Sequence, residues 1–196
     1  YSIVYQMYKI GKIKNLSFGF FPSDKPNVNG EMFFGGLPAS LTNGKHIFSC
    51  EVGKNATGWS CPLNKIIIGN WDRIYEVNDD AYFQVSEGDI LVPRSFMFFL
   101  KDHCYSDYLR REKCIFYPMN NKIECNCNVI QNLPSFTFII NEYEFNFKAE
   151  DLFKKYYDTC ELLFTPNTKA NQWIFGTSFL KYFISTFEYE KKRISL

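Results

Sequence analysis

The chain has 196 residues, of which 46% are hydrophobic, 22% charged and 19% aromatic, and its formal net charge is +1. Such a chain can bury a core, which excludes an intrinsically disordered segment, and its length suits one large domain or two small ones. A charge close to zero gives no general attraction to nucleic acid or to an anionic membrane. No apolar run approaches the ~20 residues that cross a bilayer, so we expect no transmembrane segment.

In chain order, residues 1–14 carry apolar side chains at helical spacing, and Gly11 is expected to end that helix. Further helical turns are expected after Pro93, over 150–156 and near 178–182, while 101–122 reads as loop and helix end. Strands are expected at 16–21, 31–36, 47–50, 59–68, 75–83, 136–140, 143–147 and 160–164. Many short strands separated by turns predict an all-β sandwich or barrel.

The seven cysteines and two Asn-X-Ser/Thr sequons, at Asn15 and Asn55, indicate an oxidising and glycosylating route. We expect the strands at 47–50 and 59–68 to pair as a hairpin, and Cys50 and Cys61 to form a disulfide across it.

The stretch 81–93 combines an apolar strand, a compact polar turn, a short apolar run and a closing Pro. It resembles, without a gap, the catalytic loop of the second lobe of pepsin-like aspartic proteases, where the turn is Asp-Thr-Gly. Gln84 stands at the position of the catalytic Asp, Val85 at that of the Thr and Ser86 at that of the Gly. The loop therefore resembles the family's catalytic loop but lacks the carboxylate that acts as the catalytic base.

Other stretches resemble the same family in the same order. Residues 173–188 are similar to its C-terminal signature Trp-Ile-Leu-Gly-Asp-x-Phe-Leu, with Thr177 at the Asp, and residues 30–36 to a Gly-Glu-Leu-x-Phe-Gly-Gly strand. Residues 1–21 resemble the segment that joins the two lobes. The resemblance implies an all-β fold, the C-terminal lobe of the bilobal pepsin-like fold with a few short helices. Residues 1–23 would then be the interlobe helix and connecting strand, and 24–196 the lobe.

The reaction of this family uses two carboxylates, one from each lobe, which share a proton across a water molecule. The Gln84 amide takes no proton at neutral or acidic pH, so it cannot act as a general base. The resemblance with this change implies a catalytically inactive domain that serves as a binding or structural subunit. The alternative is an aspartic endopeptidase with an unusual dyad, completed by Glu87 or by a group from the absent lobe.

The resemblance also implies a disulfide between Cys127 and Cys160, whose spacing follows the family. Cys114 with Cys125 is the pair we expect among the remaining three cysteines, which leaves Cys104 free or bonded to another chain. A rival hypothesis places zinc on His103, Cys104, Cys114, Cys125 and Cys127. We expect no metal, because the close Cys-X-Cys pair lacks the two-residue gap of a zinc knuckle.

The expected partners follow from the resemblance: an N-terminal lobe, from the same precursor or a separate chain, and a protein or peptide ligand in the cleft between lobes. We expect no cofactor and no nucleic acid. The chain starts at Tyr1 rather than Met, so we expect a mature or partial chain. The expected location is the secretory pathway, outside the cell, at its surface or in a lysosome- or vacuole-like compartment.

Overall fold

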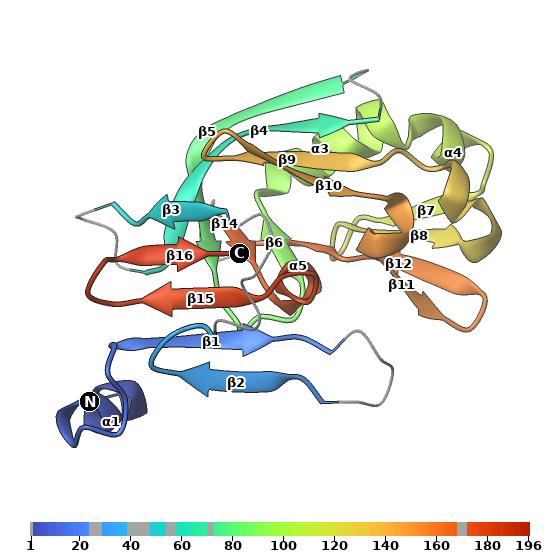
Figure 1. Ribbon diagram of the computed structural model, residues 1–196. Helices are drawn as coiled ribbons and strands as arrows, with labels where there is room; N and C mark the ends of the chain where they lie inside the picture. The colour runs from blue at the N-terminus through green and yellow to red at the C-terminus, as the bar shows by residue number, and fades with distance from the viewer. Residues whose placement is uncertain (1, 24–28, 39–47, 54–57, 70–72, 168–171) are drawn as a thin grey trace. The chain divides into compact units, whose positions relative to one another are not determined.

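The computed structural model describes residues 2–23, 29–38, 48–53, 58–69, 73–167 and 172–196. Within these ranges the chain forms three sheets of short strands and a few short helices (Figure 1), so the predicted all-β class is confirmed. The chain divides into two compact units: Tyr1–Cys61 with Phe179–Leu196, and Pro62–Ser178.

The first unit opens with helix α1 (Ile3–Lys9), whose ends are set by local chemistry. The Ser2 hydroxyl accepts a hydrogen bond from the Tyr5 amide at its N-terminus. At its C-terminus Gly11 adopts φ 71°, a left-handed conformation that glycine allows, and the Lys12 amide donates to the Met7 carbonyl. The expected stop at Gly11 is thus confirmed.

The five-stranded sheet of the first unit is antiparallel, with the order β2-β1-β15-β16-β3 (Figure 1). Its strands are β1 (Ser17–Phe21), β2 (Glu31–Phe34), β3 (Ser49–Glu51), β15 (Ser185–Glu188) and β16 (Arg193–Ser195). Phe187 is buried, and the Phe18 ring stacks on it with the centroids 4.9 Å apart. Aromatic side chains on adjacent strands therefore supply much of the apolar packing that holds this sheet.

The seven-stranded sheet has the order β10-β9-β4-β5-β14-β6-β13. Its strands are β4 (Ser60–Ile68), β5 (Arg73–Phe83), β6 (Ile90–Val92), β9 (Phe136–Ile140), β10 (Tyr143–Phe147), β13 (Phe164–Pro166) and β14 (Trp173–Phe175). Phe138 is fully buried, and its ring contacts those of Phe164 and Phe175, with centroids 6.2 and 5.3 Å away. This aromatic packing forms the core of the second unit.

Strands β9 and β10 form the hairpin that the sequence predicts. Asn141 and Glu142, at its tip, both have positive φ, which a two-residue turn of the type I′ kind requires. Along β10, buried Phe145 and Phe147 alternate with exposed Glu144. Period-two alternation and a short turn were enough to predict this element.

The four-stranded sheet of the second unit has the order β11-β12-β8-β7. Its strands are β7 (Cys114–Tyr117), β8 (Lys122–Asn126), β11 (Phe153–Tyr156) and β12 (Thr159–Leu162). The helices are α3 (Arg94–Phe99), a π-helix (Leu100–Cys104), α4 (Ser106–Arg110), two 3₁₀ helices (Cys127–Asn132 and Ala149–Leu152) and α5 (Thr177–Leu180). Helix α3 follows Pro93 as expected, and its residue Phe96 is buried.

Three local predictions are wrong, and the first is the loop expected over 101–122, which contains strand β7 (Cys114–Tyr117). Strand β3 pairs with β16 rather than with β4, so residues 48–50 and 59–68 do not form a hairpin, and Ile47 lies outside the described residues. The helix expected over 150–156 is a 3₁₀ turn to Leu152 followed by strand β11. Strand β3 pairs with a strand distant in sequence, which overrode the local signal, whereas β11 pairs with β12 only two residues further along the chain.

Candidate functional site: the loop from Gln84 to Asp89

The loop of residues 84–89 joins two strands that do not pair with each other. Strand β5 ends at Phe83 and β6 begins at Ile90, and β14 runs between them, parallel to β5 and antiparallel to β6 (Figure 1). Phe175 of β14 pairs with both Phe83 and Ile90. Buried strands on both sides thus fix the two ends of the loop.

Backbone hydrogen bonds set the path of the loop. The Gln84 amide donates to the Phe175 carbonyl at 3.1 Å, and the Glu87 amide turns back to the Gln84 carbonyl at 3.2 Å. The Thr177 amide donates to the Glu87 carbonyl at 2.8 Å, and the Ser178 amide to the Gly88 carbonyl at 2.9 Å. None of these bonds depends on the side chain at position 84.

The segment after β14 closes against the loop at Gly176. A Cβ atom on Gly176 would clash with the carbonyl oxygens of Glu87 and Asp89, so only glycine fits this approach. The Ser178 hydroxyl donates to the Gly88 carbonyl at 2.7 Å, and the Thr177 hydroxyl lies 3.2 Å from the same oxygen. Thr177, at the family's Asp position, thus still holds the loop through its amide and hydroxyl.

The backbone of the loop is hydrogen-bonded, whereas its side chains are exposed to varying degrees. Val85 is 39% exposed, Ser86 is exposed, and Gln84 and Glu87 are partly exposed. Asp89 accepts a 2.8 Å hydrogen bond on Oδ2 from the Thr165 hydroxyl. The arrangement presents an amide and a short apolar side chain on a backbone held by hydrogen bonds.

Sequence reasoning missed the Thr165–Asp89 bond and the clamp made by Gly176 and Ser178. The first joins residues 76 positions apart and leaves no local pattern. The second had a signal, because Gly176 directly follows the buried strand β14 and precedes the hydroxyl side chains of α5. A glycine at such a junction is typical of close backbone approach.

Three disulfides are present in the described part of the chain: Cys50–Cys61, Cys114–Cys125 and Cys127–Cys160. They are the pairs named from the sequence, although Cys50–Cys61 does not cross the expected hairpin. Disulfides fit an oxidising compartment such as the secretory pathway. They also contradict the zinc alternative, because three of its proposed thiolate ligands are oxidised.

Cys104 is the remaining cysteine, and its thiol is free and only 7% exposed. Burial raises its pKa to about 12, against a smaller lowering by the Arg73 charge. The thiol therefore stays protonated at physiological pH. A disulfide from Cys104 to another chain would require this part of the fold to open.

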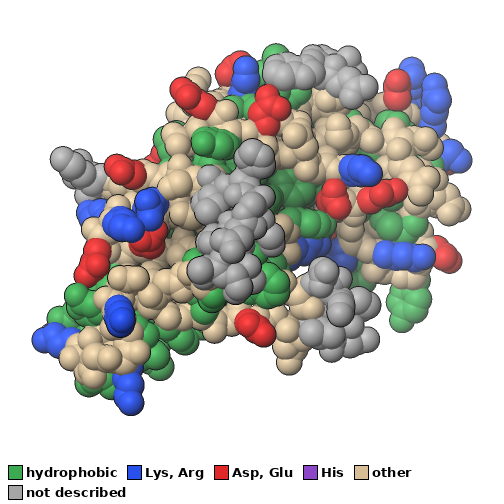
Figure 2. Space-filling model, in the orientation of Figure 1, with side chains coloured by type: hydrophobic (Ala, Val, Ile, Leu, Met, Phe, Trp, Pro, Cys, Tyr) green, Lys and Arg blue, Asp and Glu red, His purple; other side chains and the backbone are tan. Residues whose placement is uncertain are grey.

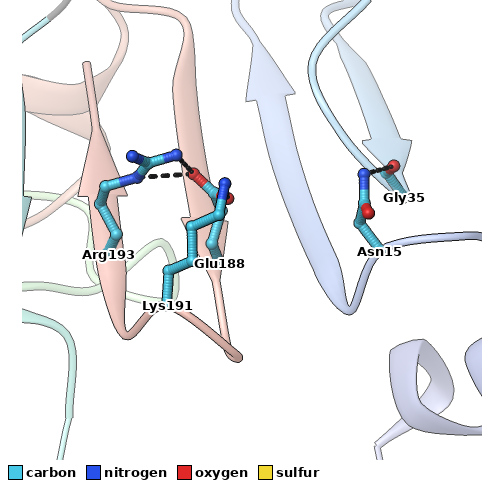
Figure 3. Close-up of polar contacts among 5 residues, drawn as sticks. All are labelled: Asn15, Gly35, Glu188, Lys191 and Arg193. Atoms are coloured by element: carbon cyan, nitrogen blue, oxygen red, sulfur yellow. Dashed lines mark hydrogen bonds and ion pairs between the residues drawn. The ribbon is translucent and has the colours of Figure 1, made fainter.

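The sequon residue Asn15 lies just before β1. Its side-chain amide donates to the Gly35 carbonyl at 3.1 Å (Figure 3), and the side chain is exposed. Ser17, the third residue of this sequon, is buried in β1. Asn55, the other sequon, lies outside the described residues.

Charged side chains are interspersed on the face shown in Figure 2, where neither Lys and Arg nor Asp and Glu dominate. In the described part of the chain no helix is long and apolar enough to cross a membrane. Among the same residues no three His, Cys, Asp or Glu side chains are grouped closely enough to hold a metal ion.

The chain belongs to the eukaryotic aspartyl protease family, whose family model matches residues 1–196. The strand arrangement is consistent with a lobe of the pepsin-like fold. This agrees with the family that the motifs around Gln84 resemble.

Curated relatives are distant and longer than this chain. Human gastricsin (Homo sapiens) is 24% identical over 187 residues, 89% of this chain and 44% of gastricsin. Aspartic protease Bla g 2 of Blattella germanica is 22% identical over 165 residues, 83% of this chain and 44% of that protein. Pregnancy-associated glycoprotein 2 of Bos taurus is 29% identical over 80 residues, 39% of this chain and 21% of that protein. The chain spans less than half the length of these relatives.

Proposed function

We propose that this chain is the C-terminal lobe of a pepsin-like protein that binds a peptide or a protein segment without cleaving it. The observation that carries the proposal is Gln84, which stands at the first position of a loop held by backbone bonds from Phe175, Thr177 and Ser178. The frame of the site is present, and the group at its catalytic position is an amide.

The chemistry of an amide supports an inactive site. Hydrolysis by an aspartic dyad requires one carboxylate that accepts a proton from water while the other donates one. The Gln84 amide can donate and accept hydrogen bonds, but it does not ionise. A peptide in the cleft could therefore be held at Gln84 by hydrogen bonds, and no group at this position would activate water.

The proposal includes an architecture and a setting. Residues 1–23 would connect to an N-terminal lobe, from the same precursor or a separate chain, and 24–196 would form the lobe itself. The ligand would lie in the cleft between the lobes. The three disulfides support a secreted, cell-surface or lysosome- or vacuole-like location, and we propose glycans at Asn15 and Asn55.

The test compares the complete gene product with its Gln84→Asp variant on a peptide library between pH 3 and pH 7. We expect the wild-type protein to retain peptides, measured by calorimetry or by capture and mass spectrometry, and to release no cleavage products. Gln84→Asp should gain acid cleavage if the first lobe supplies its own carboxylate. Inhibitor-sensitive cleavage by the wild-type protein would overturn the proposal.

A second variant tests the endopeptidase alternative. The Glu87 amide is bonded to the Gln84 carbonyl, which brings residue 87 back beside residue 84. If Glu87 completed a dyad, wild-type cleavage would occur, would be blocked by a pepstatin-type inhibitor and would disappear in Glu87→Gln. Ser86→Ala, an exposed neighbour in the same loop, is the matched control and should leave either behaviour unchanged.

A further inference from the structure

Four of the six bonded cysteines lie together in the four-stranded sheet of the second unit. Cys114 is on β7, Cys125 on β8 and Cys160 on β12, and Cys127 directly follows β8. Cys125 is paired in register with Cys114, its own disulfide partner, and with Cys160, the disulfide partner of Cys127. The two disulfides are thus neighbours on one face of the sheet.

The register places Cys125 between two cysteine partners. Cys125 is paired directly with Cys114 on β7 and also with Cys160 on β12. Directly paired residues on adjacent strands point their side chains to the same face of a sheet. Cys114, Cys125 and Cys160 therefore form a row across three strands, although Cys160 is bonded to Cys127.

Backbone hydrogen bonds between the strands show which of the two cysteine pairs is hydrogen-bonded and which is not. The Asn126 amide donates to Lys113 and the Cys127 amide to Asp158, so Cys125 forms a non-hydrogen-bonded pair with Cys114 and a hydrogen-bonded pair with Cys160. The first pair has Cα atoms 3.9 Å apart. Hydrogen-bonded pairs lie at about 5.5 Å, within the usual Cα range of disulfides, about 4.4–6.8 Å. The backbone thus offers Cys125 a second partner at bonding range.

Burial determines where a thiol from solvent would enter. Cys114 and Cys125 are each 2% exposed and Cys160 is 6% exposed. Cys127, at the start of a 3₁₀ helix, is partly exposed. Attack therefore begins at the Cys127 sulfur, because thiol–disulfide exchange needs access to the attacked atom.

We propose that these four cysteines form a thiol–disulfide exchange site in which Cys127 accepts a low-molecular-weight thiol and the bond moves to Cys125–Cys160. The thiolate attacks Cys127 Sγ, forms a mixed disulfide there and releases the Cys160 thiolate. That thiolate attacks Cys125 Sγ, forms the Cys125–Cys160 bond and releases Cys114, which takes up a proton. One external thiol is consumed, two disulfides remain, and no net electron transfer occurs.

The exchange changes what holds the edge of the sheet. Strand β7 pairs only with β8 among the described strands, and the Cys114–Cys125 bond is its covalent tie to β8. After exchange that tie is lost, while β8 and β12 become linked. Ile115 and Tyr117 on β7 are already 53% and 37% exposed, so a loosened edge would present apolar surface.

The experiment treats the native oxidised protein with millimolar reduced glutathione, followed by acid quenching, alkylation with N-ethylmaleimide and mass spectrometry of a non-reducing digest. We expect a Cys125–Cys160 link, one glutathione on Cys127 and one maleimide on Cys114, assigned by fragmentation between residues 125 and 127. Cys50–Cys61 should stay intact and buried Cys104 unlabelled, which distinguishes exchange from unfolding. Glutathione on Cys127 without a Cys125–Cys160 link would overturn the proposal.

Two double variants test the register directly. Cys114→Ser/Cys127→Ser retains Cys125 and Cys160, which face each other on β8 and β12. These two cysteines should oxidise to a disulfide, with the loss of two titratable thiols. Cys125→Ser/Cys160→Ser keeps two cysteines that are not paired across strands and should retain both thiols. A dithiol in the first variant, or a disulfide in the second, would contradict the proposal. If either variant fails to fold, the wild-type exchange measurement decides the matter.

Discussion

The loop at residues 84–89 and the four-stranded sheet both belong to the second unit, but different forces hold them. Backbone hydrogen bonds, the Ser178 hydroxyl and the close approach of Gly176 fix the loop. Two adjacent disulfides reinforce the sheet in addition to its strand pairing. The loop therefore keeps its path whatever side chain stands at position 84, whereas the sheet depends on the redox state of its cysteines.

Under the proposed function, this difference would let a protease-like loop carry an amide in place of a carboxylate and keep the same backbone path. Apart from the Thr165–Asp89 bond, the described bonds to the loop end on main-chain atoms of Gln84, Glu87 and Gly88, so an amide in place of a carboxylate at position 84 removes none of them. The side chain at position 84 could then change while the backbone path of the loop is retained.

The largest expected effect is loss of the Cys127–Cys160 bond. Cys127→Ala/Cys160→Ala should lower the free energy of unfolding by about 4 kcal/mol, because the bond closes a loop of 33 residues. Cys114→Ala/Cys125→Ala, with a separation of 11 residues, should cost about 3 kcal/mol. Urea unfolding of both variants compares the two losses in free energy of unfolding. A larger loss for Cys114→Ala/Cys125→Ala would show that chain entropy does not dominate.

The next effect tests the non-covalent clamp. Gly176→Ala should lower the free energy of unfolding by about 2–3 kcal/mol, since the new methyl group overlaps two loop carbonyls. Gly88→Ala is the control in the same loop, because a Cβ there meets no atom within 4 Å. Equal denaturation midpoints for the two variants would refute the clamp.

A smaller effect concerns the side-chain bond to the loop. Thr165→Val removes the donor to Asp89 Oδ2 and should cost about 1 kcal/mol, because Asp89 is partly exposed and water compensates in part. Thr165→Ser retains the hydroxyl and should keep most of the stability. Chemical denaturation of the pair measures the difference, and wild-type stability in Thr165→Val would show that the hydrogen bond to Asp89 contributes nothing.

The smallest effect extends the comparison to a third kind of restraint, the charge cluster at the β15–β16 turn of the first unit (Figure 3). Glu188 accepts from Arg193 Nε at 2.8 Å and pairs with Lys191 Nζ at 2.9 Å. Partial burial raises the pKa of Glu188, but the Lys191 and Arg193 side chains outweigh it and hold the pKa below its ordinary value.

Because the folded pKa is lowered, the contribution of Glu188 to stability is present at neutral pH and is lost as the pH falls through that lowered value. Glu188→Gln should therefore lower the Tm slightly at neutral pH, by less than about 1 kcal/mol of stability. The difference from wild type should shrink in acid, as Glu188 becomes protonated in the folded protein. Thermal melts at neutral and acidic pH measure it, and a constant difference would assign the effect to packing.

Local patterns predicted elements whose causes are local. Gly11 ended a helix, Asn141 and Glu142 formed a tight turn, and Pro93 preceded a helix, each for a reason contained in a few residues. The partner of β3 was mispredicted because β16 lies far along the chain, whereas the strand at 153–156 was missed although its partner β12 follows after two residues.

The sequence by itself determined the family and the all-β class, and it predicted Gln84 at the position where the family has a carboxylate, because motif spacing and side-chain chemistry are written in residue order. Only the tertiary structure decided that the loop is held through main-chain atoms, that Cys104 is buried and that Cys125 pairs with two cysteines at once. Those facts depend on distances between residues far apart in the chain, which sequence order does not contain.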